Sequence, residues 1–348
     1  MFWTCYFHNF IQSIFMNHPS AGTKQVSIII PEEDSILSCV VLTYEILLKA
    51  NEYCRAHNKI PVFNLELVGE KKKSHLHQGQ FTIEPAKHYN EVDSTDIIII
   101  PAVNKNFETI LKKNKALIEW VKQQYLAGAE VASLCTGAFL LASTGLLKGK
   151  QCSTHWQAAN AFKDLFPFVE LNTDKLITDN SGLYTTGGAI SSMNLILYLL
   201  EKYYGRETAI HIAKIFEIDI NRSSQSPFII FVGQKNHEDD EIRKAQLFME
   251  NNVGEKILVS DLADKFAIGR RHFDRRFIKA TGNTPAEYLQ RIKVEAAKKD
   301  LETTRKTVNE VMYDSGYSDT KAFREVFKKY TGLSPVEYRN KYNKEAVN

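Results

Sequence analysis

A cysteine ends an apolar run in the stretch VASLCTGAFLLA, residues 131–142. A Thr-Gly pair follows Cys135 at once, and a helical apolar pattern then begins. A nucleophile on such a strand-to-helix turn has an exposed head at a helix N-terminus, where the helix dipole and free N–H groups favour a thiolate. Cys135 is therefore a candidate catalyst or sensor, and the alternative is an inert buried thiol.

A cysteine catalyst also needs a base within hydrogen-bond reach, usually oriented by a third group. His155, in the motif STHW, is the candidate base, and the alternative is a histidine held by local hydrogen bonds. Three acidic residues, Glu32, Glu33 and Asp34, lie early in the loop PEEDSILSCVVLTYE after an apolar run. The spacing assigns none of them to the Cys135 site, so a catalytic triad is not established.

The elements that would position these residues follow an alternating pattern between residue 25 and about residue 205. Short β-branched or apolar runs predict strands at 26–30, 96–100 and 130–134. Apolar residues at three-to-four spacing predict helices over 40–58, 116–128, 191–204 and 207–216. Continuous apolar strands separated by helices indicate a mostly parallel sheet covered on both faces.

The C-terminal third contains an internal repeat. FIKATGNTPAEY, residues 277–288, matches FKKYTGLSPVEY, residues 327–338, at an offset of 50. Thr284 and Ser334 each precede a proline, which predicts a helix N-cap followed by proline in the first turn. The repeat indicates a duplicated helical unit.

Upstream of each repeat the pattern predicts a helix, a tight turn and a second helix. Phenylalanines four residues apart give each second helix an inward apolar face. The remaining surface of the two helices is basic or polar and could contact guanine edges or phosphates in a major groove; the candidate DNA-binding residues are Arg270, Arg271, His272, Arg275, Thr320, Lys321, Arg324 and Lys328. A lone basic helix would more simply be a solvated surface, but the duplication favours DNA binding.

Charge and cysteine usage narrow the class of protein further. Residues 241–348 hold 22 Lys and Arg against 16 Asp and Glu, whereas residues 1–240 hold 22 against 25, so the excess positive charge lies in the part expected to meet DNA. The five scattered cysteines indicate a reducing compartment without a disulfide scaffold or zinc site. No apolar run of about 18 residues predicts a membrane span, and no phosphate-binding glycine motif occurs. We expect a cytoplasmic protein without metal or cofactor.

Residues from about 242 to 342 resemble the AraC/XylS-type DNA-binding domain, and the ending GYSDTKAFREVFKKYTGLSPVEYR follows that family's signature nearly throughout. The resemblance implies two helix-turn-helix units joined rigidly by a helix over 285–301, with recognition helices entering successive major grooves of double-stranded DNA. Three departures stand out: Ala267 where the first turn usually has glycine, Gly269 in place of a serine N-cap, and Met312 in place of a small residue.

Residues 25 to about 231 resemble the PfpI-like branch of the class I glutamine amidotransferase-like superfamily, especially as found in GlxA-like regulators. The matching motifs are VASLCTGAFLLASTGLLKGKQCSTHW, the later TTGG and the tail RSSQSPF. The resemblance implies a flavodoxin-like three-layer sandwich, usually dimeric, with a small pocket at the cysteine turn. The implied ligand-binding residues are Cys135, Thr136, Gly137 and His155. Where the superfamily's acidic residue would align, this chain has Cys39, which counts against catalysis.

Together these patterns predict a DNA-binding transcriptional regulator whose first domain senses a small molecule. The resemblance also implies that the protein forms a homodimer. The alternatives are a PfpI-like cysteine hydrolase or glyoxalase-like enzyme with an accessory DNA-binding domain, and a non-catalytic scaffold. The expected organisation is an α/β domain followed by an all-α domain, with these bounds: extension 1–24, PfpI-like domain 25–233, linker 234–241, double helix-turn-helix domain 242–342 and tail 343–348.

Overall fold

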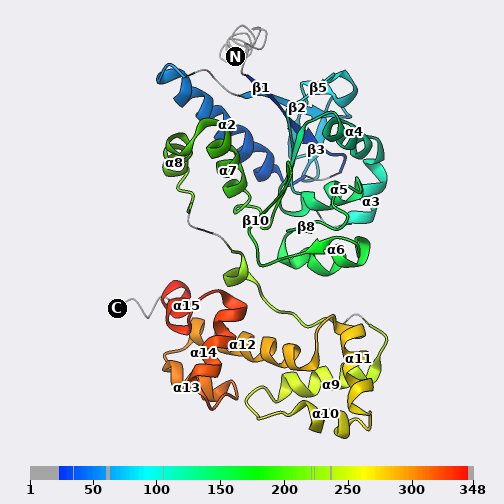
Figure 1. The fold of residues 1–348 in the computed structure, drawn as a ribbon, viewed down its shortest axis with the longest axis vertical. Coiled ribbons are helices and arrows are strands. Elements are labelled where there is room, and N and C mark those ends of the chain that lie inside the picture. Colours follow the sequence, from blue (N-terminus) through cyan, green and yellow to red (C-terminus); the bar gives the residue numbers. More distant parts are fainter. Residues whose placement is uncertain are drawn as a thin grey trace. The chain divides into compact units, whose positions relative to one another are not determined.

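The structure, a computed structural model of the chain, describes residues 23–33, 35–59, 63–104, 106–220, 222, 224–235 and 237–343 (Figure 1). The chain divides into two compact units between Gln225 and Ser226. The described residues exclude 1–22 of the extension expected at 1–24 and 344–348 of the tail expected at 343–348. The division falls eight residues before the end expected for the first domain, because residues 226–233 pack with the second unit.

A seven-stranded sheet forms the centre of the first unit, in the order β10-β11-β7-β6-β1-β2-β5. All neighbouring strands are parallel except β10 and β11, which are antiparallel. The strands are β1 (Lys24–Ile30), β2 (Phe63–Gly69), β5 (Lys87–His88), β6 (Ile97–Ile100), β7 (Glu130–Ser133), β10 (Ile177–Asn180) and β11 (Leu183–Thr186). Two small sheets pair β3 (Ser74–Leu76) with β4 (Phe81–Ile83), and β8 (Gln151–Cys152) with β9 (Glu170–Leu171).

Helices cover both faces of this sheet (Figure 1). One face carries α2 (Leu37–Ala56), α7 (Met193–Tyr204) and α8 (Arg206–Ile215), and the other carries α3 (Phe107–Lys113), α4 (Lys115–Leu126), α5 (Ala138–Ser143) and α6 (Ala159–Leu165). Successive residues of β1 pack on opposite faces of the sheet. Ile28 and Ile30 belong to the core under α2, α7 and α8, whereas Ile29 belongs to the core on the other face. Strands buried on both sides read as continuous apolar runs, so the expected three-layer sandwich is confirmed.

The second unit consists of helices that form two similar cores on the long helix α12 (Pro285–Thr303). The first core contains Phe273 and Phe277 of α11, and the second contains Phe323 and Phe327 of α14. Thr284 and Ser334 cap their helices as expected, each in a reciprocal capping box. The other helices are α9 (Asp240–Asn251), α10 (Val259–Lys265), α11 (Arg270–Thr281), α13 (Val308–Asp314), α14 (Thr320–Thr331) and α15 (Pro335–Tyr342).

The two helix-turn-helix units, α10–α11 and α13–α14, differ in their turns. The helices before the turn begin 49 residues apart, at Val259 and Val308, whereas those after it begin 50 apart, at Arg270 and Thr320. The second turn is therefore one residue longer. Both turns use a left-handed residue, Ala267 with φ 51° and Gly316 with φ 71°. Only glycine adopts this conformation without steric cost, so Ala267 strains the first turn.

Replacing Ala267 with glycine should therefore stabilise the second unit by about 0.5–1 kcal/mol. This value is the free-energy cost of the left-handed conformation for alanine minus the cost of the extra conformational entropy that glycine gives the unfolded chain. The matched control is Ala280→Gly, inside α11. That substitution should destabilise the same unit by about 0.5–1 kcal/mol, because glycine is a poor helix former.

Urea unfolding can separate the two units in the intact chain. The tryptophans that the structure describes, Trp120 and Trp156, belong to the first unit, and their fluorescence follows its unfolding. Helical circular dichroism includes the second unit. We expect the dichroism transition to move to higher urea in Ala267→Gly and to lower urea in Ala280→Gly, with the fluorescence transition unchanged. A loss of stability in Ala267→Gly would contradict the strain at this turn.

Candidate functional site

The turn after β7, residues 134–137, forms an elbow between strand and helix. Cys135 has φ 54°, in the left-handed region, and a short 3-10 turn over Cys135–Gly137 leads into α5. A Cβ on Gly137 would lie 2.6 Å from the carbonyl oxygen of Pro101 and 2.7 Å from that of Ile100. Glycine is therefore required here, because the elbow packs directly on the backbone at the end of β6.

Two threonines tie the elbow to neighbouring backbone. The Thr136 hydroxyl accepts from the N–H of Val103 at 2.9 Å and donates to the carbonyl oxygen of Val103 at 2.6 Å. The Thr154 hydroxyl donates to the carbonyl oxygen of Cys135 at 3.0 Å. These bonds satisfy buried polar groups and hold the backbone on both sides of the thiol.

The thiol itself is more enclosed than the sequence led us to expect. Cys135 is 4% exposed. Burial raises its pKa to about 12, and nearby Cys39 acts in the same direction. Bonds from Thr136 and from the Gly188 N–H lower the pKa but do not offset desolvation. The expectation of an exposed head with a favoured thiolate was thus wrong for this structure, since the cost of burying the charge exceeds the stabilisation at the helix start.

Cys39, on α2, lies beside Cys135 at the position where the resemblance placed the superfamily's acid. Its sulfur is 4.0 Å from the carbonyl oxygen of Ala189, next to the Gly188 that faces Cys135. Burial raises the pKa of Cys39 to about 11. Both thiols therefore remain neutral at pH 7, and the side chain beside Cys135 carries no negative charge.

The acidic residues of the loop after β1 have other partners. Glu32 forms an ion pair with Lys71 at 2.7 Å, and Glu33 pairs with Lys113. Asp34 lies outside the described residues. Within the described part of the chain, no carboxylate forms a hydrogen bond with Cys135 or His155.

His155 is half-buried at the start of a short 3-10 turn, Trp156–Ala158. Its Nδ1 accepts from the N–H of Gln157 at 3.2 Å, and its ring stacks on Trp156 at 5.6 Å. Burial lowers the pKa of His155, so the ring is neutral at pH 7. A neutral imidazole that accepts at Nδ1 carries its proton on Nε2. In this arrangement Nε2 is a hydrogen-bond donor, whereas a general base would need it free to accept.

Gln225 is a buried neighbour of the elbow that the sequence patterns did not predict as a site residue. It is 1% exposed, and its Nε2 donates to the carbonyl oxygen of Thr154 at 3.0 Å. Its Oε1 has no hydrogen-bond partner among the described residues. A side chain at Gly187 would collide with this amide. The available signal was the motif RSSQSPF, which contains Gln225 and accompanied the family resemblance.

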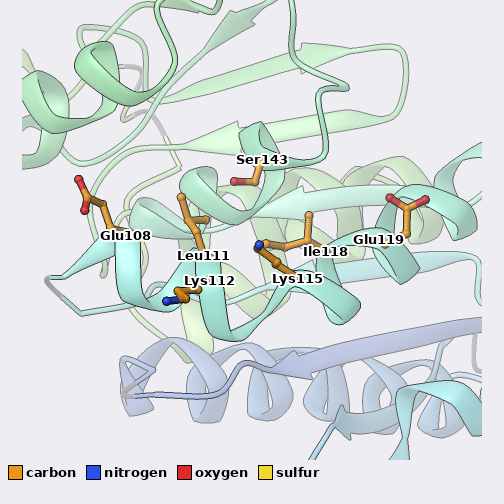
Figure 2. Close-up of a pocket in the computed structure, with 7 residues that line it drawn as sticks. All are labelled: Glu108, Leu111, Lys112, Lys115, Ile118, Glu119 and Ser143. Carbon is orange, nitrogen blue, oxygen red and sulfur yellow. The ribbon is translucent and has the colours of Figure 1, made fainter.

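A separate surface hollow of about 540 Å³ lies among α3, α4 and the end of α5 (Figure 2). It is lined by Glu108, Leu111, Lys112, Lys115, Ile118, Glu119 and Ser143. None of these residues belongs to the elbow or was predicted as a site residue. Lysines and glutamates of both signs surround the hollow, so its charge selects no class of ligand.

The predicted DNA-binding residues of α11 lie on its exposed side. Phe273 and Phe277 are buried, while Arg271, His272 and Arg275 are exposed. Arg270 is also exposed, but its Nε donates to both carboxylate oxygens of Asp274, at 3.1 and 3.0 Å. Among the ion pairs of the described residues, none includes Arg271 or Arg275. Both arginine side chains are therefore exposed and without an ion pair in the described part of the chain.

Helix α14 repeats the pattern. Phe323 and Phe327 are buried, and the basic residues Lys321, Arg324 and Lys328 are exposed with Thr320 half-buried. The helix starts at Asp319, whose carboxylate accepts from the N–H of Ala322. Over the described ranges, no helix is long and apolar enough to cross a membrane, and no cluster of three or more His, Cys, Asp or Glu residues could hold a metal ion.

The environment of Cys135 predicts slow alkylation of the folded protein. Because burial raises the pKa of this thiol to about 12 from an ordinary 9.0, iodoacetamide at pH 8 should modify it at least about 100-fold more slowly than in urea, where the thiolate is more abundant and accessible. Peptide mass spectrometry after timed quenching measures each cysteine separately. Modification of folded Cys135 at pH 8 as fast as in urea would contradict the buried neutral thiol.

Comparison with known proteins agrees with both parts of the chain. Residues 44–202 match the DJ-1/PfpI family, and residues 262–341 match a helix-turn-helix domain family. The HTH-type transcriptional regulator GbdR of Pseudomonas aeruginosa is 28% identical over 226 residues, 64% of this chain and 60% of its own length. The HTH-type transcriptional regulator GlxA of Rhizobium meliloti is 22% identical over 228 residues, 62% of this chain and 66% of its own.

Among solved structures, a Vibrio parahaemolyticus protein assigned as a transcriptional regulator covers 56% of this chain and 98% of its own, with a TM-score of 0.51 and 24% identity. This likeness supports the fold of the first unit. The match to GbdR spans about 60% of that regulator's length. The chain thus combines a DJ-1/PfpI-family domain with a C-terminal helix-turn-helix domain of the AraC type, the combination that its GlxA-like motifs predicted.

Proposed function

We propose that this protein is a sequence-specific DNA-binding transcriptional regulator whose first unit receives a small-molecule signal. The observation that carries the proposal is the pair of helices α11 and α14. Each is docked by two buried phenylalanines and exposes basic residues on its other side. Two such helices on one unit suit two successive major grooves. Double-stranded DNA is then the partner, and we propose a cytoplasmic location for the protein.

The exposed residues suit two kinds of DNA contact. Arg271 and Arg275 are one helical turn apart on α11, and Lys321, Arg324 and Lys328 extend along α14. Arginine can bond guanine O6 and N7 together, whereas lysine more often meets phosphates as a point charge. We assign α11 and α14 as recognition helices on this basis, with Arg270, His272 and Thr320 at their edges.

The first unit supports a sensing role better than a catalytic one. Cys135 has no carboxylate partner among the described residues, Nδ1 of His155 is occupied, and burial favours the neutral thiol. DJ-1/PfpI folds include enzymes, but a cysteine enzyme needs an activated thiolate and a free base. We therefore propose that Cys135, Thr136, Gly137 and His155 border a ligand site without catalysing a reaction, and that the protein acts as a homodimer through this unit.

Signal transfer from this site follows linkage. A ligand changes DNA affinity only by binding the two states of the protein unequally, and DNA then changes ligand affinity by the same factor. The elbow offers a physical route, because Thr154 bonds the carbonyl oxygen of Cys135 and its own carbonyl accepts from Gln225, the last residue of the first unit.

The DNA assignment is tested by Arg271→Ala and Lys321→Ala in the full chain. If the side chain contacts a base, each substitution should weaken binding to a selected operator by about 1–3 kcal/mol. If it contacts a phosphate, binding should weaken uniformly across sequences, and the dependence of log affinity on log salt concentration should become shallower by about 1. Footprinting and fluorescence anisotropy at two salt concentrations distinguish the two cases.

The matched control is Arg206→Ala on α8 of the first unit, an exposed arginine whose partner is Glu201. Its DNA affinity should equal that of the unaltered protein. Unchanged affinity in both Arg271→Ala and Lys321→Ala would overturn the assignment of α11 and α14 to the grooves.

The sensing role is tested with a metabolite panel. A compound that binds at 100 times its Kd should stabilise the first unit by about 2.7 kcal/mol, which tryptophan fluorescence reports because the described tryptophans lie there. The same compound should change operator affinity, and Cys135→Ser should alter both effects together. A compound that stabilises the first unit while operator affinity stays constant would show binding without signalling.

A further inference from the structure

The segment of residues 226–235, here called the strap, precedes α9 and lies along the second unit. It begins with a short 3-10 turn, Ser226–Phe228, and continues without regular secondary structure. Its side chains alternate in exposure from Ile230 to Val232, with Ile230 and Val232 exposed and Phe231 half-buried. An extended segment with this alternation presses one face against the unit that it crosses.

The beginning of the strap binds helices α12 and α15. The hydroxyl of Tyr342, on α15, donates to the carbonyl oxygen of Pro227 at 3.1 Å. Lys298 of α12 donates to the carbonyl oxygen of Ile229 at 2.6 Å, and its side chain is only 5% exposed. A buried ammonium needs its acceptors, so the strap completes the environment of Lys298.

The end of the strap binds helix α9 and the first turn of α12. Phe231 meets the ring of Tyr288 edge-on at 5.3 Å and belongs to the core that holds Phe273 and Phe277. Gly233 packs so closely on the Tyr288 hydroxyl that a Cβ there would overlap it. Gln246 of α9 then donates to the carbonyl oxygen of Gln234 at 2.7 Å.

One cation on α12, the guanidinium of Arg291, contacts both the strap and helix α14. The guanidinium of Arg291 lies 5.3 Å from the ring centre of Phe231 and 4.9 Å from that of Tyr330, on α14. Tyr330 also donates to Gln290 of α12 at 3.0 Å. The positive guanidinium is attracted to the faces of both aromatic rings. The strap, α12 and α14 therefore form one connected cluster.

We propose that the strap positions the two recognition helices relative to each other, with Phe231 and Gly233 as its positioning residues, and so fixes the operator spacing that the protein accepts. This rests on the proposed DNA-binding function. Phe231 of the strap packs in the core that holds Phe273 and Phe277, and Pro227 is bonded by Tyr342, which packs beside the core that holds Phe323 and Phe327. Loss of the strap would therefore free the two halves to pivot on α12. The strap also starts directly after Gln225, which is buried beside the elbow in the first unit, so a change there reaches the strap through the covalent chain.

The test uses the full chain and an operator obtained by selection from random duplexes. Four duplexes are compared: the operator, two operators with either two or five base pairs inserted between the subsites, and a duplex with one subsite. Gly233→Ala adds a methyl group that forces the strap from Tyr288 without altering α11 or α14. Phe231→Ala removes the ring contact without adding atoms. Val232→Ala is the matched control, because Val232 is 74% exposed.

Rigid bivalent binding makes affinity depend on spacing. We expect the unaltered protein and Val232→Ala to lose at least about tenfold in affinity on insertion, since the second subsite rotates away. Gly233→Ala and Phe231→Ala should bind the operator about 5–10-fold more weakly and should discriminate less between spacings. Both variants should bind the single subsite with unchanged affinity, because they lose only the fixed arrangement of the two recognition helices.

The strap role is overturned if both variants keep the spacing profile of the unaltered protein. It is equally overturned if they lose affinity by the same factor on all duplexes, the single subsite included, since that pattern marks damage to a recognition surface. Failure of the unaltered protein to select any sequence would instead reject the proposed DNA-binding function.

Discussion

The burial of two phenylalanine pairs against one helix is the constraint on which the second unit depends. Phe273 and Phe277, and likewise Phe323 and Phe327, are fully buried around α12. Each buried phenylalanine contributes about 1.5–3 kcal/mol through the area that it removes from water. The same packing sets the rotation of α11 and α14 about their axes. It thereby decides that the basic residues point to solvent, and the strap adds the contacts that connect both cores.

In the first unit, desolvation dominates the chemistry of the elbow. The turn has the geometry that nucleophilic enzymes use, with a left-handed Cys135 and a glycine two residues later. The start of a helix favours a thiolate, yet burial beside uncharged Cys39 raises the pKa of Cys135 to about 12. The elbow thus keeps an enzyme-like backbone while its side chains hold the thiol neutral, which suits a binding site more than a reaction centre.

Much of the architecture could be predicted because it follows from local patterns. The β-branched run of β6 is too short for a helix and is buried on both faces, and the phenylalanine spacing of α11 and α14 repeats at a fixed offset. The elbow was predictable from Cys135 and Gly137 at the end of an apolar run. The exposure of its thiol was not, because Cys39 and Gly188 reach it from distant parts of the chain.

The sequence by itself determined the order of the two domains, their elements and the basic side of each recognition helix, since apolar periodicity, caps and repeats act between residues close in the chain. The tertiary structure alone decided what surrounds each group. It buried Cys135, brought Gln225 to the carbonyl of Thr154, and laid residues 226–235 against Tyr288 and Tyr342 of the second unit. These outcomes depend on long-range packing and on the desolvation that such packing imposes, which no local pattern of residues records.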